Sequence, residues 1–181
     1  VGCEAASVAG HQKLSNLCWI YDDNHITIEG NTSLAFSEDV AKRFEGLGWN
    51  TVTVDDANDV EALDAALQSF RNCQDGPTLI LVRSIIGYGS PNKADSHEAH
   101  GAPLGEDEVR LTKRAYGWPE DAHFLVPEGV AEHFAAGIGQ RGGTRYEKWS
   151  AKFAEYEAAH PQLAADLKLI WAGQLPDGWD K

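Results

Sequence analysis

The sequence lacks methionine entirely, has only three cysteines, and contains no hydrophobic run long enough to span a bilayer. Basic residues are also scarce, because 15 Lys and Arg stand against 28 Asp and Glu and give a formal charge of −13. Such an acidic chain is a poor partner for nucleic acid or for an anionic membrane surface. The odd number of widely spaced cysteines argues against a disulfide framework or a zinc knuckle and predicts a reducing, cytoplasmic location.

The absence of methionine has a second implication. The chain opens on Val1 and is helix-like from its first residues. We therefore expect the 181 residues to be a piece of a longer polypeptide.

The hydrophobic pattern predicts an α/β fold. Apolar residues at helical spacing alternate with short continuous apolar runs, which is typical of a parallel sheet with right-handed crossovers. Ser37 is the predicted N-cap of the second helix, and Gly48 follows its end. The expected helices cover 1–14, 38–47, 59–72 and 106–116. The expected strands cover 17–21, 49–54 and 77–83, and the pattern predicts that the first and the last are buried.

The C-terminal part has a different texture. From 127 to 181 the pattern is mostly helical and rich in alanine, and a glycine-rich stretch at 137–143 predicts a break. This part carries an aromatic stripe at helical spacing: Tyr146, Trp149, Phe153 and Tyr156. Core or interface packing explains the stripe better than stacking on a ligand does. We expect an α/β domain over 1–120 and a helical extension over 121–181 that leads into a linker.

Two irregular segments are candidate functional regions. Asp22, Asp23 and Asn24 end the first strand, and a β-like Ile-Thr-Ile at 26–28 follows. The second segment, 85–104, leaves the last strand and is longer than most loops without a function. Both lie at the carboxyl edge of the predicted sheet, where α/β proteins bind ligands, and their oxygen atoms suit Mg²⁺ or Ca²⁺. On these residues alone, an acidic turn without a ligand is the simpler interpretation.

Three local patterns occur in a fixed order along the chain. They are EAASVAGH at 4–11, YDDNHITI at 21–28, and the stretch 86–104, which contains IGYGSPNK and HEAHGAPL. Together they resemble the diphosphate-binding domain of the transketolase family. The resemblance implies a three-layer, parallel-sheet thiamine-diphosphate-binding domain, incomplete at its N-terminus because the Gly-Asp-Gly half of the family motif is absent.

The resemblance also implies roles for individual residues. Asn24 and the backbone carbonyl of Ile26 match ligands of the Mg²⁺ or Ca²⁺ ion that carries the diphosphate. Four residues match contacts of the family to thiamine diphosphate: Ile28, Ile86, Gly87 and His100. His100 also matches the family's catalytic histidine. A histidine there can donate to an anionic oxygen or move a proton near neutral pH, whereas the alternative is a loop histidine with a structural hydrogen bond.

Other charged residues carry weaker assignments. Glu4 resembles a glutamate of a carboxylate network between subunits, and a helix-dipole role in the first turn explains it equally well. His97 with His100 suggests a two-histidine metal site, but no third ligand is evident. A position near a phosphate is one interpretation of Lys93 and Asn92, and a solvated loop cation is the simpler one. His25 occupies a position that varies in the family, so it receives no role.

The implied function is that of a transketolase of the pentose phosphate pathway. Such an enzyme transfers a two-carbon ketol unit from a ketose phosphate to an aldose phosphate, and the carbanion chemistry belongs to the cofactor. The resemblance implies a homodimer in which the remaining transketolase domains complete the site, so we expect this chain alone to be inactive. Two alternatives stay open, namely a dihydroxyacetone synthase and a non-catalytic or split subunit that keeps the fold for assembly.

Overall fold

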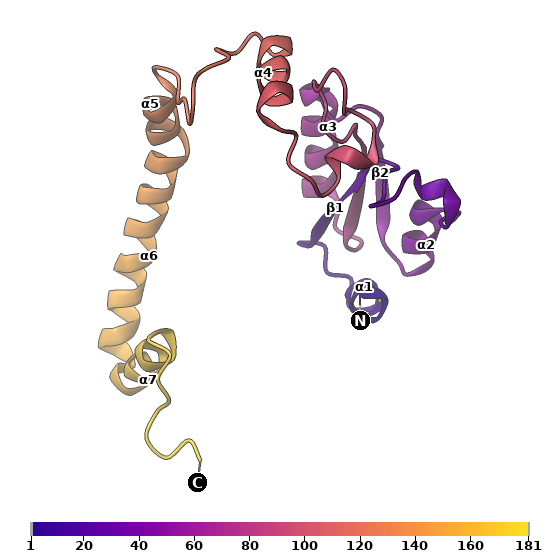
Figure 1. The fold of residues 1–181 in the computed structure, drawn as a ribbon. Helices are drawn as coiled ribbons and strands as arrows, with labels where there is room; N and C mark the ends of the chain where they lie inside the picture. Colours follow the sequence, from indigo (N-terminus) through magenta and orange to yellow (C-terminus); the bar gives the residue numbers. More distant parts are fainter. Residues whose placement is uncertain (1, 181) are drawn as a thin grey trace. The chain divides into compact units, whose positions relative to one another are not determined.

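The computed structural model describes residues 2–180, and these divide into two compact units on either side of a boundary between 122 and 123. The first unit alternates helices and strands along the chain (Figure 1). Its elements are α1 (Gly2–His11), β1 (Cys18–Asp23), η1 (Thr32–Leu34), α2 (Val40–Gly46), β2 (Asn50–Val54), α3 (Val60–Asn72), β3 (Thr78–Arg83), η2 (His97–Ala99) and α4 (Glu106–Ala115).

The sheet of this unit has three parallel strands in the order β1-β3-β2. Ile80 of the central strand is level with Ile20 of β1 and Val52 of β2. Because side chains alternate along a strand, β3 contributes to an apolar core on each face of the sheet. The predicted α/β layered fold is therefore confirmed.

One face of the sheet is covered by α1 and α2. Ala6, Ala9, Trp49 and Leu79 form its buried core. The indole Nε1 of Trp49 donates to the carbonyl oxygen of Ala6 at 2.8 Å, which ties α1 to the start of β2. The ring of Trp49 also packs against Phe44 of α2, with centroids 5.2 Å apart, so a few aromatic contacts hold both helices on this face.

The opposite face is covered by α3. Its core consists of Val54, Ala66, Ile80 and Val82. The predicted helix over 59–72 is present but begins at Val60, because Asp59 is its N-cap: the Asp59 carboxylate accepts from the backbone N–H of Ala62 at 2.9 Å. Since α3 runs from the end of β2 to the start of β3, it returns the chain to the amino edge of the sheet.

Three sequence predictions in this unit are wrong in detail. The first strand was expected to be buried and to end at Tyr21, but β1 continues through Asp23 and lies at an edge of the sheet, with Ile20 63% exposed. The expected β-like 26–28 run is only a single bridge between Ile26 and Asn31. Asp39, rather than Ser37, caps α2, because its carboxylate reaches the N–H of the third helical residue, as in a standard N-cap.

The second unit is helical. Its elements follow one another almost without interruption: α5 (Val130–Phe134), the π-helical segment η3 (Ala135–Gly139), α6 (Gln140–Ala159) and α7 (Pro161–Trp171). The break expected at 137–143 is wrong. Gly139 keeps helical angles (φ −60, ψ −53), Gly137 and Gly139 lie in the wider π turn, and Gly142 and Gly143 lie in α6.

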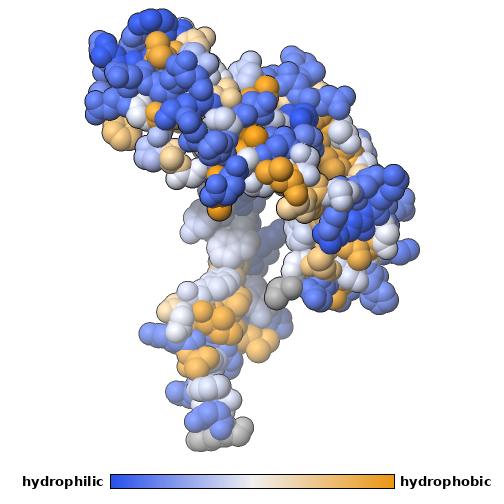
Figure 2. All heavy atoms as spheres, turned by 45° about the vertical axis from the view of Figure 1, so that its right-hand side comes forward, coloured by the Kyte–Doolittle hydropathy of each residue, from blue (hydrophilic) through white to orange (hydrophobic). Residues whose placement is uncertain are grey.

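The aromatic stripe of this unit is continuous along α6. The rings of Trp149 and Phe153 stack with centroids 5.4 Å apart, and Trp171 of α7 packs against Phe153 at 5.1 Å. Figure 2 shows hydrophobic atoms at the surface of this unit. Leu163 and Ile170 of α7 are among its exposed apolar residues. None of the helices between residues 2 and 180 combines the length and apolar character needed to cross a bilayer.

Candidate functional site

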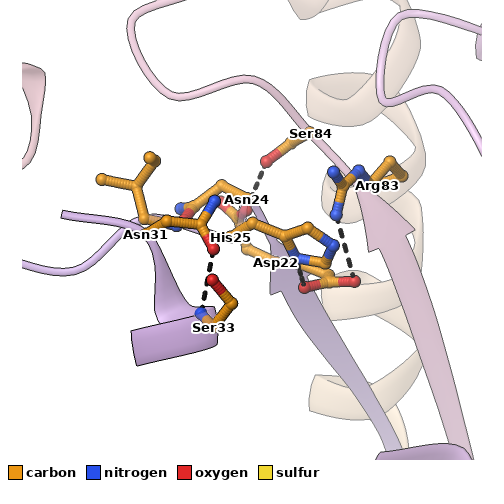
Figure 3. A network of polar contacts seen from close by, with 9 residues as sticks. Asp22, Asn24, His25, Asn31, Ser33, Arg83 and Ser84 are labelled. Atoms are coloured by element: carbon orange, nitrogen blue, oxygen red, sulfur yellow. Dashed lines mark hydrogen bonds and ion pairs between the residues drawn. The ribbon is translucent and has the colours of Figure 1, made fainter. Parts of the chain in front are cut away.

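The carboxyl ends of β1 and β3 meet, because the two strands are parallel neighbours with Asp23 level with Arg83. The hydroxyl of Ser84 donates to the carboxylate of Asp22, and an Arg83 guanidinium nitrogen lies 3.6 Å from the Asp23 carboxylate (Figure 3). The two strands are thus joined by side chains just where their chains leave the sheet. Both irregular segments named from the sequence start at this junction.

The 24–31 turn follows β1 and is closed by its own polar groups. The side-chain oxygen of Asn24 accepts from the N–H of Ile26 at 3.0 Å. Two backbone bonds complete the turn, from Thr32 N–H to the His25 carbonyl at 2.8 Å and from Thr27 N–H to the Gly30 carbonyl at 2.7 Å. Neither of these bonds uses the carbonyl of Ile26.

His25 is held in an unusual backbone conformation at the start of this turn. Its φ is +59°, in the left-handed region, which only a few per cent of non-glycine residues adopt. Its Nδ1 lies 2.8 Å from the Asp23 carboxylate. Asp23 therefore contacts His25 on the turn and Arg83 on the neighbouring strand.

A polar hollow of about 360 Å³ lies beside the turn. The η1 segment forms part of its wall, where the side chain of Asn31 caps Ser33 N–H at 2.9 Å. Asp23, His25 and Asp39 contribute charged or titratable groups to the lining. The hollow is thus a polar space next to Asn24.

The second segment, here called the β3–α4 loop (residues 84–105), folds back on its own start. Gly87 has φ +64°, and a Cβ there would lie 2.9 Å from the Cβ of Ala99, so both the angle and the space require glycine. The N–H of Asp95 donates to the Ile86 carbonyl at 3.0 Å, which closes the first half of the loop. Ile86 and Gly87 are consequently half-buried at a tight turn.

The remaining site residues named from the sequence lie in separate places. Ile28 is 71% exposed, and His100 is exposed where η2 ends. Within residues 2–180, no hydrogen bond or ion pair joins either of them to Asn24. Glu4 is exposed in the first turn of α1 and lines an apolar hollow with Val8 and Trp19. The structure thus joins the two segments through Asp22, Asp23, Arg83 and Ser84. Sequence reasoning placed Asp22 and Asp23 in a candidate region but gave them no contact with the other segment, and it did not single out Arg83 or Ser84.

Sequence reasoning also missed Glu108. It is the third of three consecutive acids at the start of α4, all of which the sequence explains by the helix dipole. Only Glu108 is buried, and its carboxylate accepts from the hydroxyl of Ser90 and from both the N–H and the side-chain amide of Asn92. These hydrogen bonds, that of Asn92 first, lower the pKa of Glu108 below its ordinary value. No signal in the sequence separates it from its two acidic neighbours.

The oxygen atoms of the 24–31 turn fit a hard cation. In residues 2–180 no group of three or more His, Cys, Asp or Glu side chains is arranged to hold a metal ion. An amide oxygen and a backbone carbonyl, such as those of Asn24 and Ile26, are donors that suit Mg²⁺ and Ca²⁺. The Asn24 oxygen keeps a second lone pair after accepting from Ile26, so it remains a competent ligand.

These features define a class of protein. A parallel sheet with helices on both faces, and with two polar turns joined at its carboxyl edge, is an α/β domain that binds its ligand outside the ends of the strands. The chain belongs to the transketolase family, since the family model described as "Transketolase, thiamine diphosphate binding domain" matches residues 1–176. The resemblance noted in the sequence is therefore confirmed.

Individual relatives agree with this assignment. A transketolase of Geobacillus stearothermophilus is 48% identical over 180 residues, which cover 99% of this chain and 27% of that protein. A transketolase of Bacillus subtilis is 44% identical over 181 residues, again 27% of its length. The crystal structure of a Pichia stipitis transketolase in complex with sedoheptulose 7-phosphate matches with a TM-score of 0.86 at 36% identity, covering 99% of this chain and 27% of that one. The chain thus spans about a quarter of the length of these relatives.

Proposed function

We propose that this chain carries part of the thiamine diphosphate site of a transketolase. The observation that carries the proposal is the junction of the β1 and β3 carboxyl ends, because it brings the 24–31 turn and the β3–α4 loop to one edge of the sheet. The family match over residues 1–176 supports the choice of cofactor. When bound, thiamine diphosphate supplies the carbanion chemistry that breaks and forms a carbon–carbon bond.

The 24–31 turn would hold the cation that accompanies the diphosphate, Mg²⁺ or Ca²⁺. The side-chain oxygen of Asn24 and the carbonyl oxygen of Ile26 are its ligands in this proposal. Both are neutral, so they add no negative charge beside an anionic diphosphate on a chain with a formal charge of −13.

The apolar residues and the histidine would act on the reacting end. Ile28 and Ile86 cover the cofactor ring and exclude water, and Gly87 allows the backbone to approach closely. An imidazole nitrogen of His100 donates a hydrogen bond to an oxygen of the diphosphate or the sugar, or holds a proton there near neutral pH. The exposure of Ile28 and His100 leaves both side chains accessible to such a ligand.

The complete protein would transfer a two-carbon ketol unit between sugar phosphates in the pentose phosphate pathway. Sugar phosphates are the ligands of the Pichia stipitis complexes, which supports this substrate class. The remaining transketolase domains and a second copy of the protein would complete the site, with Glu4 at the subunit contact. The free cysteines are consistent with a cytoplasmic enzyme.

The test is Asn24→Ala in the complete protein, with thiamine diphosphate affinity measured by titration at several Mg²⁺ concentrations. We expect affinity to fall by at least about tenfold, and most at low Mg²⁺, because one cation ligand is gone. Asn72→Ala is the matched control, since Asn72 ends α3 at the opposite edge of the sheet and should leave affinity unchanged. Equal affinity of the Asn24→Ala protein and the wild type at every Mg²⁺ concentration would contradict the ligand role.

A further inference from the structure

A buried carboxylate lies outside the proposed cofactor contacts. Glu108 is only 7% exposed, and acidic side chains are almost never buried unless they are paired. Its partners all come from the β3–α4 loop: the Ser90 hydroxyl, and the N–H and side-chain amide of Asn92, both at 2.8 Å. Glu108 thus connects the first turn of α4 to the loop that precedes that helix.

These hydrogen bonds continue into the part of the loop that carries the proposed cofactor contacts. Ser90 N–H donates to the Gly87 carbonyl at 2.9 Å, and the hydroxyl of Ser90 also accepts from Lys93 N–H at 3.2 Å. A change in the position of Ser90 would therefore move the tight turn at Gly87.

The hydrogen bonds between Asn92 and Glu108 also close the second half of the loop. Asn92 and Glu108 are 16 residues apart in sequence, and His100 lies between them. Joining the two ends of a segment lowers the number of conformations it can adopt. A further contact, from the Tyr116 hydroxyl to the Tyr88 carbonyl, attaches the other end of α4 to the loop.

We propose that the Glu108 carboxylate is a positioning group, which holds Ser90 and Asn92 so that the loop presents Gly87 and His100 to thiamine diphosphate. The inference rests on the proposed function for its ligand. It requires a carboxylate rather than any polar side chain, because all three partners are donors and an ionised carboxylate only accepts.

The experiment compares four versions of the complete protein. Glu108→Gln keeps the shape of the side chain but turns one acceptor into a donor that faces the Asn92 amide. The double variant Glu108→Gln with Asn92→Asp reverses that donor–acceptor pair and restores it at unchanged net charge. Glu106→Gln is the control, because Glu106 is exposed in the same helical turn and makes the same contribution to the helix dipole.

Two quantities are measured for each protein. The first is backbone hydrogen exchange of residues 87–100 without cofactor, with β3 and α3 amides as the internal reference. The second is thiamine diphosphate affinity at saturating Mg²⁺. For Glu108→Gln we expect loop exchange and the dissociation constant each to rise about tenfold, since a buried charge-assisted contact is lost. The reference amides should not change, and the double variant should recover most of both losses.

The outcomes separate this inference from the function on which it depends. Loop hydrogen exchange that is the same in Glu108→Gln and Glu106→Gln would overturn the positioning role. So would a double variant whose loop exchanges as fast as that of the Glu108→Gln protein. Unchanged cofactor affinity in Glu108→Gln, beside normal binding by the wild type, would also overturn it. A wild-type protein that does not bind thiamine diphosphate would instead overturn the proposed function, and with it the cofactor part of the inference.

Discussion

Gly10 offers the sharpest test of how the first unit is packed. A Cβ built at Gly10 of α1 would lie 1.9 Å from the carbonyl oxygen of Leu47, and real Cβ contacts are essentially never under 3.0 Å. In the substitution Gly10→Ala, α1 must therefore move away from the chain between α2 and β2. That movement would stretch the 2.8 Å hydrogen bond from Trp49 Nε1 to the Ala6 carbonyl.

The loss of folding free energy in Gly10→Ala follows from the steric clash and from the weakened Trp49–Ala6 hydrogen bond. Overpacking of this kind costs about 1–3 kcal/mol, and the weakened hydrogen bond adds about 0.5–1.5 kcal/mol. Alanine recovers about 1 kcal/mol of helix propensity relative to glycine. We expect Gly10→Ala to lower the free energy of unfolding by about 0.5–3.5 kcal/mol in total.

The assay is urea denaturation followed by tryptophan fluorescence. Gly46→Ala is the matched control, because Gly46 also lies in a helix and nothing is within 4 Å of its added Cβ. That substitution should leave stability unchanged or raise it by up to about 1 kcal/mol. A Gly10→Ala protein as stable as Gly46→Ala would refute the close packing of α1 against Leu47.

Two further predictions concern the same unit. Trp49→Phe keeps an aromatic ring in the core but removes the donor to Ala6, so we expect the free energy of unfolding to fall by about 1–3 kcal/mol; a loss below the error of urea denaturation would contradict a contribution from this bond. The hydrogen bonds to Glu108 and to Asp39 lower the pKa of each carboxyl below its ordinary value of 4.5 or 3.8. The stabilisation from these bonds is therefore complete above the ordinary pKa values and is lost as pH falls through the lower pKa values of the folded state. Unfolding measured from neutral to acidic pH should therefore show falling stability, with a smaller dependence in Glu108→Gln; identical pH profiles of the two proteins would count against this assignment.

The elements that the sequence predicted well are those that local chemistry determines. Asp59 caps α3 where the helical apolar spacing begins, and the continuous apolar run of β3 is buried in the centre of the sheet. In α3 propensity, capping and hydrophobic pattern favour the same structure, and in β3 propensity and hydrophobic pattern do, so both assignments are unambiguous.

The errors occur where two local signals compete. Ser37 and Asp39 are both good N-caps, and only the backbone geometry selects Asp39. The glycines at 137–143 each cost about 1 kcal/mol in a helix, but no proline is present to remove a hydrogen bond, so a π turn keeps the helix continuous. A glycine-rich pattern predicts reduced helix stability and does not by itself predict a break.

The candidate site was only partly predictable. The parallel sheet predicts that the segments after β1 and β3 share one edge, and they do. The contacts that join them, from Ser84 to Asp22 and from Arg83 to Asp23, depend on a register that the sequence does not reveal. Glu108 could not be distinguished from Glu106 either, because it is buried against a loop residue, Asn92, that lies 16 positions earlier in the sequence.

The position of β1 has a practical consequence for anyone who prepares this chain. Among the described residues β1 pairs with β3 alone, so its outer side presents main-chain amides and carbonyls next to an uncovered isoleucine at position 20. An unpaired strand edge of this kind pairs with other extended segments, including the same edge of a second molecule. Samples of the isolated chain should therefore become oligomeric as they are concentrated, and a charged residue in place of Ile20 is the first change to make for solubility.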